Sequence, residues 1–260
     1  MTMLLQQGVT AQAQARPEAT ALVFKGTRLT YAALEEASNR LAHLLREAGC
    51  RRGDRVGLLM PKMPTAILAM LGALKADAIY VPMDPASPAA RQARVLEVSD
   101  CRFILAAGLV GQGLHDALAA ATLREPPIIG WLGEDLLPET DPAPAFTLRD
   151  LAAYPSTPPA YANTDGDVAH ILFTSGSTGI PKGVMITHAS VAHLIRWAAA
   201  YFGIAHADRI SQHPPLRFDV STFDVFGTLW GGAELHLVPP ELNLLPHKLA
   251  QFIREARLTQ

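Results

Sequence analysis

The chain has 260 residues, of which 49% are hydrophobic, and its net charge at pH 7 is −2. This length and composition suffice for a large globular core. The near-neutral charge favours neither nucleic acid nor a membrane surface as a partner. No apolar run reaches transmembrane length, and Met3-Leu4-Leu5 is too short for the hydrophobic region of a signal peptide, so we expect a cytoplasmic protein.

Helix and strand signals alternate through the first half of the chain. Apolar residues recur at helical spacing over 31–48, between Thr30 as a candidate N-cap and Gly49 as a stop. Residues 56–60 form an apolar run of the kind that fills a strand buried on both faces. After them we expect a helix over 65–75, a strand over 79–81, a helix over 88–98 and a strand over 102–106.

A proline-rich stretch divides this half from the next. Residues 138–159 contain six prolines, which predicts a boundary between a first subdomain, 1–160, and a second, 161–260. The alternation of strands and helices predicts the α/β class, with mostly parallel sheets flanked by helices. In the second half we expect strands over 168–173, 209–212 and 233–238, and helices over 188–202, 220–230 and 246–257.

The most distinctive segment follows the predicted strand 168–173. It combines three glycines, four hydroxyl residues and one lysine, so its backbone N–H groups, hydroxyls and ammonium can all converge on phosphate. It is not a Walker A loop, because Pro181 stands where the second glycine belongs. An ordinary surface loop is the alternative. The predicted phosphate-binding residues are Thr174, Ser175, Gly176, Ser177, Thr178, Gly179, Lys182 and Gly183.

Four motifs in order resemble the adenylation domains of nonribosomal peptide synthetases, within the AMP-forming acyl- and aminoacyl-activating superfamily. They are residues 29–34, 74–85, 174–183 and 218–221, with Asp77 where a glycine is usual. The resemblance implies two α/β subdomains from the large N-terminal region of such an enzyme. It also implies that ATP activates an amino-acid carboxylate to an aminoacyl-adenylate, and that the acyl group passes to the phosphopantetheine thiol of a carrier protein.

The resemblance also assigns roles to particular residues. Residues 174–183 would hold the β- and γ-phosphates, and Lys182 would be catalytic by neutralising charge on the leaving pyrophosphate. Mg²⁺ is implied together with ATP, but its protein ligand is expected downstream, so we expect no metal ligand in this chain. Cys50 and Cys101 lack the spacing of a metal site and are expected to be buried or incidental thiols.

The motif around Asp219 is expected to bind the amino acid. In the family, the matching aspartate holds the α-amino group, and residues matching Val220 and Phe223 help to line the side-chain pocket. A carboxylate in an apolar pocket is costly unless an ammonium meets it, so Asp219 would select substrates with an amine. The alternative is that Asp219 caps the helix. Phe218 matches an aromatic position near the path of the thiol, with core packing as its alternative.

Other polar residues are expected to have no direct part in the chemistry. His170, His188 and His213 have no spaced partner for catalysis or metal binding, so we expect structural roles. We expect Lys62 and Lys75 to be solvated. Asp224, which lies one turn beyond Asp219, is expected to face solvent or a capping partner.

The family's later motifs have no counterpart in this chain. They are the adenine-contacting stretch with its magnesium-binding glutamate, the ribose-binding aspartate and the lysine of a mobile C-terminal domain. We therefore expect a fragment or a truncated product that is inactive alone. The alternatives are a fragment of an acyl-CoA ligase, which Asp219 disfavours, and a non-catalytic remnant that binds nucleotide.

Overall fold

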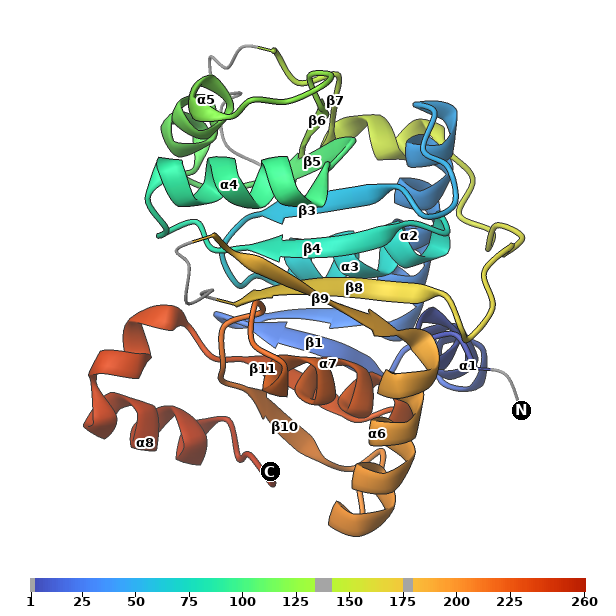
Figure 1. The fold of residues 1–260 in the computed structure, drawn as a ribbon. Helices are drawn as coiled ribbons and strands as arrows, with labels where there is room; N and C mark the ends of the chain where they lie inside the picture. Colours follow the sequence, from blue (N-terminus) through green and yellow to red (C-terminus); the bar gives the residue numbers. More distant parts are fainter. Residues whose placement is uncertain (1–2, 134–141, 175–179) are drawn as a thin grey trace.

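The computed structural model describes residues 3–133, 142–174 and 180–260 (Figure 1). The helices within these ranges are α1 (Gln6–Ala15), α2 (Tyr31–Glu47), α3 (Pro64–Lys75), α4 (Ala89–Ser99), α5 (Gly111–Ala120), α6 (His188–Phe202), α7 (Val220–Gly231) and α8 (Pro246–Glu255), with 3₁₀ turns η1 (Leu148–Ala153) and η2 (Pro240–Leu244). The strands are β1 (Thr20–Phe24), β2 (Thr27–Thr30), β3 (Arg55–Leu59), β4 (Ile79–Met83), β5 (Phe103–Ala106), β6 (Ile128–Trp131), β7 (Phe146–Thr147), β8 (Val168–Thr174), β9 (Lys182–Thr187), β10 (Arg209–Gln212) and β11 (Glu234–Leu237).

The strands form two mixed, mostly parallel sheets. The larger sheet has the order β7-β6-β5-β3-β4-β8-β9, and only β8 and β9 pair antiparallel. The smaller sheet has the order β10-β11-β1-β2, with β1 and β2 antiparallel. Helix α3 contacts β3 and β4 of the larger sheet and β1 of the smaller one, so it lies between the sheets (Figure 1). The α/β class with helix-flanked, mostly parallel sheets is therefore confirmed.

Both sheets take strands from the two sides of residue 160. In the larger sheet β4 pairs with β8, and in the smaller one β1 pairs with β11. The sheets therefore do not follow the expected boundary at residue 160, and the division into subdomains 1–160 and 161–260 stays a prediction. The helices and strands expected from periodicity are present, whereas α1, β1, β2, α5, β6, β7 and β9 were not expected.

The segment that follows η1 lies along one face of α2. Arg46 of α2 donates to the carbonyl oxygen of Ala160 at 2.8 Å, and Asn39 donates to that of Ser156 at 2.7 Å. Extended backbone without a sheet partner needs such side-chain donors to satisfy its carbonyl groups. The proline-rich connection is thus held against a helix that comes more than 100 positions earlier in the chain.

The backbone conformation at Asp77 explains why the family that the chain resembles usually has glycine at this position. Its backbone has φ +62°, in the left-handed region that disfavours most side chains. The buried carboxylate accepts hydrogen bonds from the backbone N–H groups of Ala162 and Asn163, both at 3.0 Å, and pairs with Arg46 at 2.9 Å. The aspartate therefore adds an anchor for the connection that glycine could not provide.

The expectation that Lys62 and Lys75 are solvated was wrong. Lys75 is fully buried, and its Nζ lies 2.6 Å from both Glu35 Oε2 and Asn39 Oδ1. Lys62 is also buried and donates to two backbone carbonyl oxygens. Buried ammonium groups are tolerated here because neighbouring oxygens replace water.

The remaining features of the fold concern the two cysteines and the character of the helices. Cys50 and Cys101 are both free and buried, as expected. Within the described ranges, none of the helices has both the length and the apolar character that crossing a bilayer requires.

Candidate functional site

A cavity of about 630 Å³ opens beyond the carboxyl ends of β4 and β8. Asp84, which follows β4, lines it together with Thr174, the last residue of β8. Phe218 and Asp219, directly before α7, line the same cavity. Ligands of α/β proteins commonly bind outside the carboxyl ends of parallel strands, so this position is a natural binding site.

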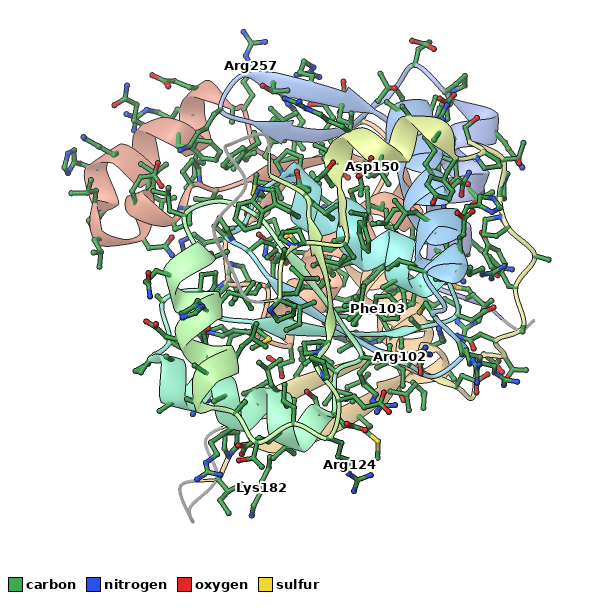
Figure 2. All side chains as sticks on the ribbon, turned by 90° about the horizontal axis from the view of Figure 1, so that it is seen from above. Arg102, Phe103, Arg124, Asp150, Lys182 and Arg257 are labelled. Carbon is green, nitrogen blue, oxygen red and sulfur yellow. The ribbon has the colours of Figure 1, made fainter. Side chains whose placement is uncertain are left out.

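The structure brings together only part of the predicted phosphate-binding segment. Thr174 lines the cavity with an exposed side chain, and Lys182 is paired with it across the hairpin of β8 and β9. Lys182 is exposed and lies at the outer edge of the molecule in Figure 2. Five of the predicted residues lie outside the described residues: Ser175, Gly176, Ser177, Thr178 and Gly179.

Lys182 and Gly183 belong to strand β9 and not to a loop, which corrects the expected extent of the phosphate loop. Gly183 pairs with Phe173 in the hairpin. A Cβ atom on Gly183 would lie 2.8 Å from Ile171 Cγ2 and 3.1 Å from Phe173 Cζ. Packing against β8 is therefore sufficient to require this glycine, without any contact with phosphate.

Asp219 is exposed at the mouth of the cavity and precedes α7. Its Oδ1 accepts a hydrogen bond from the backbone N–H of Val220 at 2.9 Å. The other carboxylate oxygen has no hydrogen-bond partner among the described residues. The geometry therefore contains the helix cap and leaves one carboxylate oxygen available to a ligand.

The residues beside Asp219 point in different directions. Phe218 is 48% exposed, so it is not a core residue, and the Arg217 guanidinium lies 4.5 Å from its ring centroid. Val220 is 60% exposed, and Phe223 packs against Phe202 of α6 with ring centroids 5.9 Å apart. Neither Val220 nor Phe223 lines the cavity, so the structure does not bring these two together with Asp219 there.

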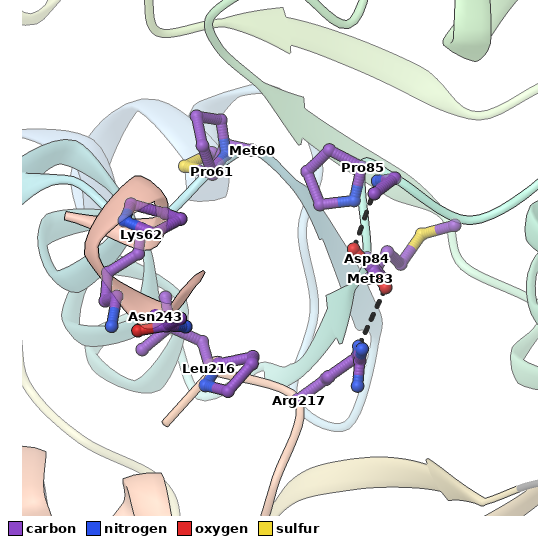
Figure 3. A pocket seen from close by; sticks show the side chains of 12 residues that line it. Met60, Pro61, Lys62, Met83, Asp84, Pro85, Leu216, Arg217 and Asn243 are labelled. Carbon is purple, nitrogen blue, oxygen red and sulfur yellow. Dashed lines mark hydrogen bonds and ion pairs between the residues drawn. The ribbon is translucent and has the colours of Figure 1, made fainter. Parts of the chain in front are cut away.

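A second, smaller pocket of about 230 Å³ adjoins the cavity (Figure 3). Asp84 and Arg217 line both spaces, and Arg217 Nε lies 2.9 Å from Asp84 Oδ2. Figure 3 shows this ion pair on one side of the small pocket and Lys62 on the other. The pair therefore lies where the two spaces meet.

Lys62 and Asp224 are two ionisable groups that lie close enough to affect each other's pKa. Burial lowers the pKa of Lys62 to about 8, and the charge of Asp224 opposes that shift. Burial raises the pKa of Asp224 to about 7, against the opposing effects of Lys62 and of the His213 backbone N–H. Asp224 was expected to face solvent or a capping partner; it is half-buried and lies near Lys62.

Two arginines of the site were missed by sequence reasoning. Arg217 lies next to Phe218, and a cation directly before the motif was a usable signal. Arg91 of α4 also lines the cavity, and its guanidinium has no hydrogen-bond or ion-pair partner among the described residues. No feature of the sequence singled out Arg91, because its contribution depends on where α4 packs.

Among the described residues, no group of three or more His, Cys, Asp or Glu side chains is arranged to hold a metal ion. The expected downstream position of the magnesium ligand stays a prediction.

The sequence of this chain matches one protein family and is similar to several known proteins. The family described as AMP-binding enzyme matches residues 9–260. The chain is 36% identical over 257 residues to Surfactin synthase subunit 2 of Bacillus subtilis (strain 168), and 34% identical over 261 residues to Tyrocidine synthase 3 of Brevibacillus parabrevis. Each alignment covers 99% of this chain but only 6% and 4%, respectively, of those much longer relatives.

A similar structure is that of FmoA3, a nonribosomal peptide synthetase. It superposes with a TM-score of 0.84 at 32% identity, covering 100% of this chain and 25% of that chain. The forms of FmoA3 bound to AMPPNP and to alpha-methyl-L-serine-AMP each superpose with a TM-score of 0.83.

Proposed function

The chain belongs to the family of AMP-binding enzymes and corresponds to the N-terminal part of an adenylation domain of nonribosomal peptide synthetases, and we propose on this basis that it activates an amino-acid carboxylate with ATP. The products are an aminoacyl-adenylate and pyrophosphate, and the acyl group then passes to the phosphopantetheine thiol of a carrier protein. The chain spans a small part of its relatives' length. We propose that it is part of a longer protein and that the activity belongs to that protein. A cytoplasmic location stays a prediction.

The observation that carries this proposal is the shared cavity of Thr174 and Asp219. Adenylation requires a carboxylate to meet a phosphate group in a fixed orientation. The end of β8 provides the phosphate side of the cavity, and Asp219 provides a carboxylate for the α-ammonium. FmoA3, which has an AMPPNP-bound form and an alpha-methyl-L-serine-AMP-bound form, supports this proposal for the present chain.

The residues present fit a phosphate-bearing ligand. Thr174 presents a hydroxyl, Arg91 has a guanidinium without a partner among the described residues, and Lys182 adds an exposed ammonium beside Thr174. ATP supplies the activated phosphorus, and magnesium offsets the charge of its phosphates. In this arrangement Asp219 orients the amino acid, while Lys182 and Arg91 stabilise negative charge on the leaving pyrophosphate.

One alternative comes from the same superfamily and another from a different class. A ligase for acids without an α-amine has no use for a carboxylate at position 219, so the exposed Asp219 at the cavity favours amino acids. A nucleotide-binding remnant would keep the phosphate side of the cavity but would not turn over.

Amino-acid-dependent exchange between ATP and labelled pyrophosphate tests the proposal on the protein that contains this chain. We expect exchange with one amino acid or a few related ones, and none with the matching acids that lack the amine. Exchange that prefers the desamino acids would support the acyl-CoA ligase, and nucleotide binding without exchange would support the remnant. The isolated 260-residue chain is the control, and we expect it to be inactive.

A further inference from the structure

Lys62 is a buried lysine whose hydrogen bonds go to a distant part of the chain. It lies between β3 and α3, and its side chain is 7% exposed. Its Nζ donates to the carbonyl oxygen of Gln212 at 2.9 Å and to that of His213 at 2.6 Å. Burying an ammonium is costly unless its protons are bound, so the position of this group is set by those two carbonyl groups.

The two carbonyl groups open the segment that carries the proposed amine anchor. Gln212 ends β10, and residues 213–219 lead from there to α7. At the far end of the segment, Ser221 Oγ donates to the carbonyl oxygen of Phe218 at 2.6 Å and contacts that of Leu216 at 3.1 Å. The segment is therefore fixed at its start by Lys62 and at its end by Ser221.

Asp224 of α7 lies near the same point of the chain. The backbone N–H of His213 lowers the pKa of the Asp224 carboxyl against the effect of burial, and the carbonyl oxygen of His213 accepts from Lys62. The backbone at His213 is thus close to side chains from two different elements. A shift of Lys62 would release the start of the segment, and Asp219 lies six residues further on.

We propose that Lys62 is a positioning residue, which sets the place of Asp219 through the backbone of Gln212 and His213 without touching the substrate. The expected effect of Lys62 on amino-acid binding rests on the proposed function. Its expected effect on the order of residues 213–219 does not depend on that function. Measuring both therefore distinguishes a failure of the inference from a failure of the proposed function.

Lys75 provides the matched control. It is buried like Lys62, and burial lowers the pKa of its ammonium to about 8 as well. Its partners are Glu35 and Asn39 of α2, and it contacts neither the cavity nor residues 213–219. A general loss of stability from removing a buried lysine would therefore appear in both variants, whereas a positioning effect would appear only at Lys62.

The experiment compares Lys62→Met and Lys75→Met in the protein that contains this chain. We expect Lys62→Met to raise the KM for the amino acid by about tenfold or more, while the KM for ATP changes by less than about twofold, because only the amine anchor is displaced. In the same variant, hydrogen exchange of the amides of residues 213–222 should accelerate by about tenfold relative to those of β8 and β9. Lys75→Met should change neither quantity.

Two further variants keep the result decisive. Lys62→Arg retains two donors and should recover most of the amino-acid KM and the amide protection. If Lys62→Met does not fold, Asp224→Asn removes the charge next to Lys62 and His213 and should shift both readouts in the same direction, by less.

Unchanged amide exchange over residues 213–222 in Lys62→Met would overturn the inference, as would equal effects of the two methionine variants or parallel increases of both KM values. If the parent protein shows no exchange with any amino acid, the proposed function fails, and the amide exchange still decides the role of Lys62.

Discussion

Arg217 and Asp84 form an ion pair, Nε to Oδ2 at 2.9 Å, that joins two motifs separated by 133 positions in the chain. Asp84 follows β4 of the larger sheet, and Arg217 precedes α7. The Arg217 side chain is 36% exposed and that of Asp84 is 25% exposed. Water therefore screens the attraction, and its contribution to stability is small. Because the pair lies where the cavity and the small pocket meet, its main effect is on the charge around a ligand.

Arg217→Gln should separate these two effects. We expect the free energy of unfolding to change by less than about 1 kcal/mol, as for other partly exposed pairs. The KM for ATP should rise several-fold, because the cavity loses a cation and the negative charge of Asp84 is left without its partner. Exchange kinetics and urea unfolding measure the two quantities. Arg55→Gln, which breaks a partly exposed pair with Asp100 outside the cavity, is the control and should leave the KM unchanged.

Asp219→Asn tests whether the Asp219 carboxylate binds the α-ammonium group of the substrate. Losing a charged hydrogen-bond partner should lower the specificity constant for the amino acid by roughly ten- to a hundredfold. The desamino analogue should lose far less, because it has no ammonium to bind. Pyrophosphate release is measured for both substrates with parent and variant. Asparagine caps helices nearly as well as aspartate, so a pure capping role predicts no loss on either substrate.

Lys182→Ala tests the phosphate side of the site. Loss of one electrostatic contact to the leaving pyrophosphate should slow adenylate formation by up to about a hundredfold, with little effect on amino-acid binding. The first turnover of adenylate formation and the amino-acid dissociation constant are the measurements. Lys248→Ala, at an exposed position of α8, is the control. An unchanged rate in a folded Lys182 variant would show that this ammonium does not act on phosphate.

Asp77→Asn should destabilise the fold although asparagine tolerates the left-handed backbone. The variant loses the charge that binds Arg46 and two backbone N–H groups, which should lower the free energy of unfolding by about 2 kcal/mol or more. Asp100 is the matched control, since its backbone is also left-handed, with φ +50°, while its carboxylate is 60% exposed. Asp100→Asn should cost less than about 1 kcal/mol in the same urea titration.

The fold should lose stability in mild acid because of two buried histidines. Burial lowers the pKa of His170 and of His188 to about 4, from an ordinary value of 6.5. The unfolded chain therefore binds protons more readily than the folded one. This stability is fully present above about pH 6.5 and is lost as the pH falls toward 4, at about 1.4 kcal/mol per pH unit for each histidine.

His170→Phe isolates the contribution of one of these histidines. His170 stacks on Tyr80 with ring centroids 5.0 Å apart, and its Nδ1 has no hydrogen-bond partner among the described residues, so phenylalanine should keep the packing and remove the proton site. Urea unfolding at pH 7.5, 6 and 5 should show a shallower acid decline for this variant. His247→Gln, at an exposed position, should follow the parent curve, and identical slopes for all three proteins would contradict the assignment.

The sequence by itself determined the elements whose signals are local. The helix over 31–48 was found because apolar residues repeat at helical spacing, and its cap is present, with Thr30 Oγ1 accepting from the backbone N–H of Ala33 at 3.1 Å. The buried strands were found because parallel strands covered on both faces are continuous apolar runs. Strand β9 was missed because the composition of residues 174–183 is that of a loop, and only pairing with β8 shows where the loop ends.

Tertiary structure alone decided which side chains share the site. The burial of Lys62 follows from carbonyl groups about 150 positions away, and the pairing of Arg217 with Asp84 follows from the meeting of the end of β4 with the segment before α7. The same holds for Asp77, whose identity departs from the usual glycine but whose partners lie on a connection that has no periodicity. Local propensity depends on neighbours in the chain, whereas burial and charge pairing depend on neighbours in space. The sequence therefore predicted the elements and the family. The contacts around the cavity depend on the tertiary structure.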